Sequence, residues 1–409
     1  MAILGADRRQ QKLSPVLKAL RDAAWLKADR AKAWRNALLA ASGAGAAALV
    51  SFAHGGLDPT GKPLGTDFVS FYAASELVLA GQSAAVYDPQ AHRAAEIAIF
   101  GRDLGYFAFF YPPMFLLTCA PLAMLSYLGA LATWLAATFA AFAASLRGWL
   151  DRRIDWATVV AFPAVFLTLG HGQNAFLTAA LFSVGGLWLE RRPILAGIAF
   201  GLLGFKPHLG IMLPVALAAG GRWKTIAAAA ATLTAFAAMS YLAFGANTWR
   251  SFLASSALAR TTLEQGILGP KMMSAFAAVR VLGGSVALAY ALQAVATLAV
   301  GMALVGAIRR RPGPRAEAAL LMTAALLATP FLLDYDLVIL AAPLAWLTRE
   351  GLATGFRPWE KIGLLSGYVL PLAARSIAIA AHAPLAPIVL AAIFCLILRR
   401  TFGSSANSP

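Results

Sequence analysis

Long apolar runs separated by short basic loops constrain this chain more than any other feature. A helix of about 20 apolar residues crosses a bilayer, and in the hydrocarbon only helices and closed barrels satisfy every backbone hydrogen bond. The pattern predicts an all-α polytopic membrane protein. The candidate spans number twelve: 36–54, 125–146, 154–169, 174–189, 193–204, 208–220, 223–244, 286–308, 316–332, 336–348, 361–379 and 384–398.

Composition agrees with a membrane protein. Hydrophobic residues make up 60% of the 409 residues, and charged residues make up 13%, against roughly 25% in soluble domains. The net charge of +16 would suit a nucleic-acid-binding protein, but the basic residues lie mostly in short loops between spans, so we expect no nucleic-acid partner. The two cysteines, Cys119 and Cys395, both lie in apolar runs and do not indicate a disulfide framework.

The distribution of basic residues predicts the topology. With both termini cytoplasmic, 25 of the 34 Lys and Arg residues fall on the cytoplasmic side, as the positive-inside rule requires. We therefore expect a multi-pass protein of a bacterial inner (plasma) membrane. The predicted parts are a basic amphipathic helix over 1–35 on the lipid surface, one transmembrane domain over 36–400 with periplasmic loops at 55–111 and 245–285, and a disordered cytoplasmic tail over 401–409.

Two stretches do not fit simple spans. Residues 193–220 are too short for two full crossings at about 1.5 Å per residue, and a hairpin of two half-length helices that turns at 205–208 fits the basic residues at both of its ends. Residues 111–126 are predicted to dip into the outer half of the membrane. Broken helices of this kind are tolerated where they line a cavity.

Two ionisable residues on the outer side are the main candidates for chemistry. Asp67 follows the first span and begins a segment that we expect to form a helix at the membrane face; it either caps that helix, or serves as a functional acid, or both. Lys206 lies at the tip of the short hairpin, where an ammonium group is costly unless it meets water or an anion. A phosphate is the expected anion, and snorkelling to the headgroups is the alternative.

Other polar residues collect on the same side. His171, Gln173 and Asn174 either contact a sugar or only end one helix and begin the next. Asp334 and Asp336 resemble a metal pair, but no further carboxylate or histidine stands at helical spacing, so we expect neither a metal nor a cofactor. Three cations in the second outer loop are expected to help bind an anion: Arg260, Lys271 and Arg280.

Six motifs, taken in order, resemble one known family. They are GTDF at 65–68, FFYPP at 109–113, GQN at 172–174, GFKPHLGI at 204–211, KMMSAFA at 271–277 and TPFLLDYDL at 329–337. The chain resembles, from about residue 35 to 400, the polyprenyl-phosphate-mannose-dependent α-1,2-mannosyltransferases of glycosyltransferase family 87, which have the GT-C fold. Where better-known members carry a histidine after the penultimate Pro-rich motif, this chain has Asp334-Tyr335-Asp336.

The resemblance implies a reaction and its residues. A sugar, mannose by resemblance, would pass from a polyprenyl-phosphate donor to a glycan or glycolipid acceptor on the periplasmic face, with inversion. Asp67 would be the general base, and the donor phosphate would be held by Lys206, Arg260, Lys271 and Arg280. Contacts to the sugar or the acceptor are expected from Tyr72, Tyr111, His171, Gln173, Asn174, His208, Asp334 and Asp336.

A transporter or lipid flippase is the alternative function. Broken helices suit a transporter equally well, but many transporters consist of two related halves. The two long outer loops share no motif. The sequence therefore favours the transferase.

Overall fold

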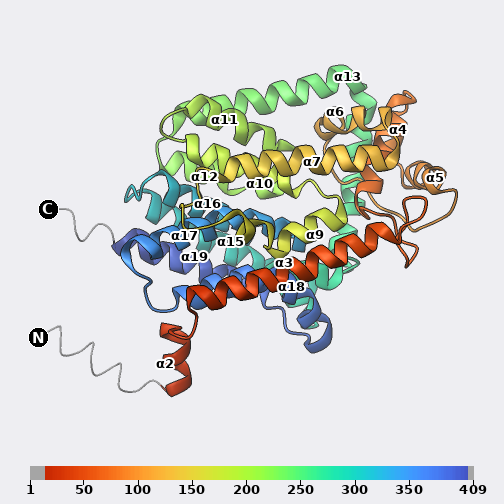
Figure 1. Cartoon of the computed structure of the whole chain (residues 1–409). Coiled ribbons are helices and arrows are strands. Elements are labelled where there is room, and N and C mark those ends of the chain that lie inside the picture. Colours follow the sequence, from red (N-terminus) through yellow and green to blue (C-terminus); the bar gives the residue numbers. More distant parts are fainter. Residues whose placement is uncertain (1–13, 404–409) are drawn as a thin grey trace, which may run out of the picture.

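Helices build all the regular structure of residues 14–403, the part of the chain that the computed structural model describes. Only isolated β-bridges accompany them in this part. The start of α3 and the end of α19 lie at the same end of the molecule (Figure 1). The first half contains α2 (Pro15–Asp22), α3 (Ala28–Ser51), α4 (Phe68–Leu79), α5 (Pro89–Phe100), α6 (Leu116–Cys119), α7 (Tyr127–Leu146), α8 (Trp156–Val160), α9 (Pro163–His171) and α10 (Ala175–Trp188).

The second half of the described chain contains nine further helices. They are α11 (Pro193–Leu202), α12 (Met212–Ala219), α13 (Trp223–Glu264), α14 (Ala275–Val281), α15 (Val286–Ile308), α16 (Pro314–Ala328), α17 (Ala341–Thr354), α18 (Glu360–Ala381) and α19 (Ala386–Gly403). Short 3-10 turns join several of them: η1 (Ser83–Tyr87), η2 (Pro113–Phe115), η3 (Ala120–Met124), η4 (Leu203–Phe205), η5 (Pro207–Leu209), η6 (Gly269–Lys271) and η7 (Asp334–Leu340).

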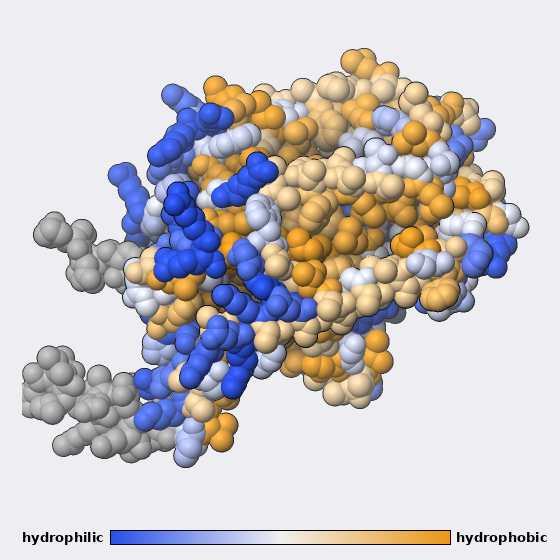
Figure 2. Space-filling view, in the orientation of Figure 1, coloured by the Kyte–Doolittle hydropathy of each residue, from blue (hydrophilic) through white to orange (hydrophobic). Residues whose placement is uncertain are grey.

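The chain is a multi-pass membrane protein. Among the described residues, five helices are long and apolar enough to cross a membrane: Tyr127–Leu146, Trp223–Glu264, Val286–Ile308, Asp334–Thr354 and Glu360–Ala381. Five shorter apolar stretches accompany them, so the total of twelve spans stays a prediction. Figure 2 shows a mainly apolar band between hydrophilic residues at the end that holds the start of α3 and others at the opposite end, near α5.

The structure confirms the broken hairpin over 193–220. Helix α11 leads into η4, the chain turns at Lys206, and η5 and α12 return. Close packing of α11 on α13 sets the position of the tip, because a Cβ on Gly197 would lie 2.5 Å from the carbonyl oxygen of Thr225, and one on Gly201 would lie 2.6 Å from that of Ala229. Small residues let helix backbones approach in this way within membranes.

The predicted outer loop over 245–285 needs correction in its first half. Helix α13 runs on to Glu264, interrupted only by Gly245, whose φ of 77° and ψ of 170° bend the chain there. Residues 246–264 contain neither Gly nor Pro, so they have ordinary helix propensity although their hydropathy is lower. Arg260 lies in this continuation.

The two ends of the chain also differ from their predictions. The basic segment 1–35 does not form one helix in its described part, because Ala23 adopts a left-handed φ of 41° after α2 and α3 begins at Ala28. Residues 1–13 of that segment lie outside the described residues. The tail prediction over 401–409 is wrong at its start, since α19 reaches Gly403, and residues 404–409 lie outside the described part.

Candidate active site

Two glycine turns place Asp67 against the loop that precedes α10. Gly65 and Gly172 have φ values of 68° and 64°, and a Cβ on Gly172 would lie 2.6 Å from Phe68 Cβ and 3.2 Å from Gly65 Cα. Only glycine allows both the positive φ and this approach without strain. The contact is closed by a hydrogen bond of 3.0 Å from the Asp67 backbone N–H to the carbonyl oxygen of His171.

The Asp67 carboxylate faces polar side chains from two distant segments. Gln173 donates from Nε2 to Asp67 Oδ2 at 3.0 Å. Lys271 Nζ lies 3.1 Å from Oδ2 and 3.4 Å from Oδ1, and His171 Nδ1 lies 3.7 Å from Oδ1. Asp67 occupies the N-cap position of α4, but its side chain accepts no hydrogen bond from the described backbone of that helix. Its carboxylate therefore serves this cluster and does not cap the helix.

Electrostatics keep Asp67 ionised. Burial by itself raises the pKa of Asp67, but the charge of Lys271, the neighbouring His171 and the Gln173 hydrogen bond outweigh burial, and the pKa lies below its ordinary value. Burial lowers the pKa of His171 to about 4, so this ring is neutral at pH 7. Lys271 is therefore the cation that stabilises the carboxylate at neutral pH.

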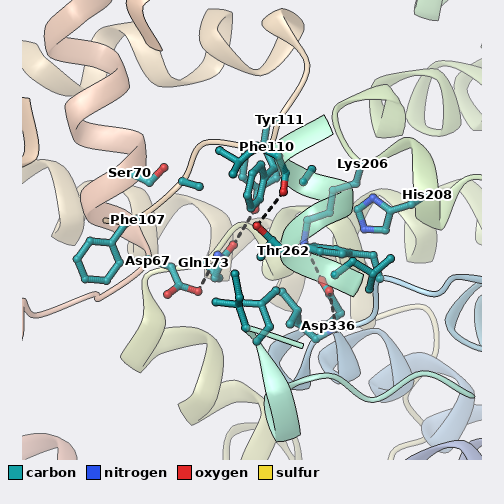
Figure 3. Close-up of a pocket in the computed structure, with 18 of the residues that line it drawn as sticks. Asp67, Ser70, Phe107, Phe110, Tyr111, Gln173, Lys206, His208, Thr262 and Asp336 are labelled. Atoms are coloured by element: carbon teal, nitrogen blue, oxygen red, sulfur yellow. Dashed lines mark hydrogen bonds and ion pairs between the residues drawn. The ribbon is translucent and has the colours of Figure 1, made fainter. Parts of the chain in front are cut away.

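A hydrogen-bonded series orients the Gln173 amide. The Tyr111 hydroxyl donates to Gln173 Oε1 at 3.1 Å, and the Asn174 backbone N–H donates to the same oxygen at 3.2 Å. With Oε1 engaged by two donors, Nε2 is directed at Asp67 (Figure 3). Through Gln173, the Tyr111 hydroxyl thus helps to hold the Asp67 carboxylate in place, and Tyr111 comes from a third segment of the chain.

A second Lys–Asp pair lies deeper in the molecule. Lys206 Nζ is 2.7 Å from Asp336 Oδ1, and the two side chains are only 3% and 2% exposed. Lys206 therefore does not snorkel to the headgroups; a carboxylate neutralises it inside the protein. The Tyr335 ring contacts both pairs, because its centroid lies 5.3 Å from Lys206 Nζ and 5.4 Å from Lys271 Nζ, within cation–π range.

One cavity of about 540 Å³ joins the two pairs. Figure 3 shows Asp67 on one side of it, Lys206 and His208 on the other, and Gln173 between them. Arg260 reaches the cavity from α13 with a side chain that is 71% exposed, and its partner Glu264 is 3.9 Å away. The remaining wall is largely apolar and includes Phe110, Phe205, Phe252, Leu258, Leu263, Ile267, Leu268, Phe331 and Leu333. A cavity of this kind suits an amphiphilic ligand with a polar, anionic end.

Several residues predicted for the site do not line this cavity. The Tyr72 hydroxyl donates to the Leu125 carbonyl oxygen at 2.8 Å. Arg280 donates to the carbonyl oxygens of Gly284 and Glu264 and lines a second cavity. His171 supports Asp67 from beside the cavity, and two further side chains are fully buried away from it: Asn174 and Asp334.

Sequence reasoning did not single out Tyr335 as a site residue. Its ring lies on the cavity wall between the two lysines. The available signal was its place between Asp334 and Asp336 in a short polar stretch of an apolar segment. We expected sugar or acceptor contacts from the two carboxylates there and took no account of the aromatic ring between them.

Comparison with protein-family models identifies the class of protein to which this chain belongs. The model of glycosyltransferase family 87 matches residues 109–330, which is more than half of the chain. The chain belongs to glycosyltransferase family 87. As a member of this family it is a membrane glycosyltransferase, and the transporter alternative is not retained. Neither the comparison with curated proteins nor that with solved structures gives a match.

The family match covers only part of the cavity of this glycosyltransferase. Gln173, Lys206 and Lys271 fall within the matched residues, whereas Asp67 and Asp336 lie outside them. Both lysines are thus paired with carboxylates from outside the matched part. The roles of Asp67 and Asp336 have to be argued from the contacts that they make.

Proposed function

We propose that this glycosyltransferase moves a sugar, mannose by family resemblance, from a polyprenyl-phosphate donor to a glycan or glycolipid acceptor on the periplasmic face. The observation that carries the proposal is the joining of Asp67, Lys271, Lys206 and Arg260 to one cavity with a largely apolar wall. The carboxylate suits a proton acceptor, the cations suit a phosphate, and the apolar side chains suit the first isoprene units of a lipid. A nucleotide donor would not require that wall.

The chemistry needs a base and cations. The acceptor hydroxyl oxygen attacks the anomeric carbon, and the bond from that carbon to the phosphate oxygen breaks with its electron pair passing to the phosphate. Asp67 takes the hydroxyl proton as the new glycosidic bond forms. Because the leaving group is already an anion, no general acid is required, and cations that stabilise the growing phosphate charge lower the barrier. Attack from the face opposite the phosphate inverts the anomeric centre.

The cations divide into two groups by their present partners. Arg260 is largely exposed, and Lys271 is held by a carboxylate that is more exposed than Asp336, so both can turn to a phosphate with small rearrangement. Lys206 is held by buried Asp336, and we infer that it acts mainly through this pair and the Tyr335 ring. The scheme uses side-chain charges alone, and the expectation that no metal takes part remains a prediction.

Two features support the proposed sidedness. The cytoplasmic end is assigned to the basic loops and the start of α3, and the hydrophilic surface near α4 and α5 lies at the opposite end of the apolar band (Figure 2). Asp67 immediately precedes α4. On this basis we propose that the cavity opens on the periplasmic side, where a lipid-linked donor can enter from the outer leaflet.

Transfer from defined donors tests this function. The purified full-length protein is incubated with membrane glycolipids and glycans from its own source and with radiolabelled polyprenyl-phosphate mannose, polyprenyl-phosphate glucose or GDP-mannose. We expect label from a polyprenyl-phosphate sugar, and not from the nucleotide sugar, to enter a product. Transfer from GDP-mannose with no use of either lipid donor would overturn the proposed donor class.

A further inference from the structure

We propose that Lys271 exchanges one anionic partner for another during the reaction: Asp67 in the free enzyme and the donor phosphate in the complex. Donor binding would thereby release Asp67 to act as a base. The inference rests on the proposed function, because it takes the donor to carry a phosphate. It adds a reason why the base becomes active only when a donor is in place.

The geometry of the free enzyme holds Asp67 inactive. Lys271 Nζ contacts both carboxylate oxygens, at 3.1 and 3.4 Å, and the side chains are only 15% and 20% exposed. A carboxylate that is paired with an ammonium group in a partly desolvated site accepts a proton poorly. A phosphate that enters the same cavity competes directly for this ammonium group, since Lys271 and Asp67 both line it.

The segment that carries Lys271 has space on both sides. Ile267, Leu268 and Lys271 line the cavity with Asp67, whereas Gly266 and Gly269 line the second cavity, of about 380 Å³. The segment therefore has open space on two faces at Gly266 to Lys271, whereas Met272 and Met273 beyond it belong to the packed core. Open space of this kind leaves room for a local shift of Lys271.

The ends of this segment limit the movement. Gly266 and Gly269 have φ values of 68° and 42°, a left-handed backbone conformation that glycine adopts without strain. Beyond Lys271, the Met273 backbone N–H donates to the carbonyl oxygen of Leu332 at 2.8 Å. This bond ties the far end of the segment next to Tyr335, whose ring stays within reach of the ammonium group when it leaves Asp67.

The Lys206–Asp336 pair in the same cavity is more deeply buried than the Lys271–Asp67 pair. Lys206 and Asp336 are 3% and 2% exposed and lie 2.7 Å apart, so a phosphate reaches them less readily than it reaches Lys271. Exchange is therefore assigned to the more exposed pair. The buried pair keeps the Tyr335 ring in position while Lys271 moves.

Because Asp67 and the phosphate would compete for the Lys271 ammonium group, the affinity for polyprenyl phosphate tests the exchange without any measurement of transfer. If Lys271 must leave Asp67 to hold the phosphate, Asp67→Asn should bind polyprenyl phosphate, without any sugar, more tightly than the parent protein, by about tenfold. In a Lys271→Met background the same Asp67→Asn change should give no gain. The four dissociation constants, measured on the detergent-solubilised full-length protein, form a double-mutant cycle for this one contact.

Two further variants serve as controls for this binding experiment. Asp88→Asn removes a negative charge from the first outer loop but keeps a good N-cap for α5, and it should leave the dissociation constant unchanged. Asp67→Ser repeats the test with a smaller side chain in case the amide distorts the site. Thermal unfolding of every variant establishes that it is folded before its affinity is compared.

The outcomes separate this inference from the proposed function. Tighter binding by Asp67→Asn that disappears with Lys271→Met supports the exchange. Normal binding by the parent with no gain in folded Asp67→Asn and Asp67→Ser, or a gain that persists without Lys271, overturns the exchange alone. If the parent does not bind polyprenyl phosphate at all, the proposed donor class fails and the exchange fails with it.

Discussion

Lys206 and Asp336, which are 130 positions apart in the chain, form an ion pair of 2.7 Å between two side chains that are almost completely buried. The pair joins the tip of the α11–α12 hairpin to η7. Removal of one partner leaves a buried charge without compensation, whereas replacement of both by apolar residues removes the whole desolvation cost. The pair therefore matters to the fold as well as to the cavity.

Lys206→Met should lower the free energy of unfolding by about 3–5 kcal/mol, because it leaves Asp336 buried and unpaired. The double variant Lys206→Met with Asp336→Leu should recover most of that loss. Thermal unfolding in detergent measures both. Equal stability of Lys206→Met and the parent would show that the lysine is not needed to neutralise Asp336.

The close approach of Gly172 to Gly65 predicts that Gly172→Ala displaces Asp67. The new Cβ would meet Phe68 Cβ at 2.6 Å and would need a positive φ, whereas a Cβ on Gly170 meets nothing within 4 Å. We expect Gly172→Ala to destabilise the protein by about 1–3 kcal/mol and to impair transfer. Gly170→Ala is the matched control and should change neither property; transfer by Gly172→Ala at the parental rate would contradict the assigned role of this turn.

The hydrogen bond from Tyr111 to Gln173 predicts a selective effect on catalysis. Tyr111→Phe removes one donor from Gln173 Oε1, so the amide holds Asp67 less firmly and the transfer rate should fall several-fold. The cost in stability should be about 1 kcal/mol. Tyr72→Phe removes a comparable hydroxyl bond, to Leu125, away from the cavity. Rates measured side by side should fall only in the Tyr111 variant, and an equal effect of the two changes would count against the orienting role.

The lowered pKa of His171 predicts how stability depends on pH. The unfolded chain takes up a proton at His171 near pH 6.5, whereas the folded protein does so only near pH 4 because of burial. The contribution of neutral His171 to the free energy of unfolding is therefore fully present above pH 6.5, and it is lost as the pH falls towards 4. Unfolding measured across this window should show the loss, and His171→Gln should reduce it. An identical pH dependence in the parent and in His171→Gln would contradict a buried, neutral His171.

The local parts of the site could be predicted from the sequence. The hairpin tip at Lys206 and the acid at Asp67 followed from hydropathy and from the cost of charge near a membrane. Gln173 was singled out because it lies between two apolar runs, and it does contact Asp67. These features depend on residues close together in the chain.

The partners of the charged groups could not be predicted in the same way. Lys271 and Asp67 are 204 positions apart, and helix packing decides which cation meets which carboxylate. Hydropathy ended the span before Gly245 although α13 continues to Glu264, because a helix that leaves the membrane keeps its propensity while its apolar character falls. Arg280 was grouped with the other outer cations by its charge, but the α14 segment directs it to the second cavity.

The most direct test of Asp67 as the general base is glycosyl transfer by Asp67→Asn, measured together with its thermal stability. The side chain makes no capping bond to the described backbone of α4, so the variant should fold with at most a modest loss of stability from the weakened contact with Lys271, and it should still bind polyprenyl phosphate. Turnover should fall on the order of a hundredfold or more, as is usual for the loss of a general base. A well-folded Asp67→Asn protein with near-parental turnover would contradict the account.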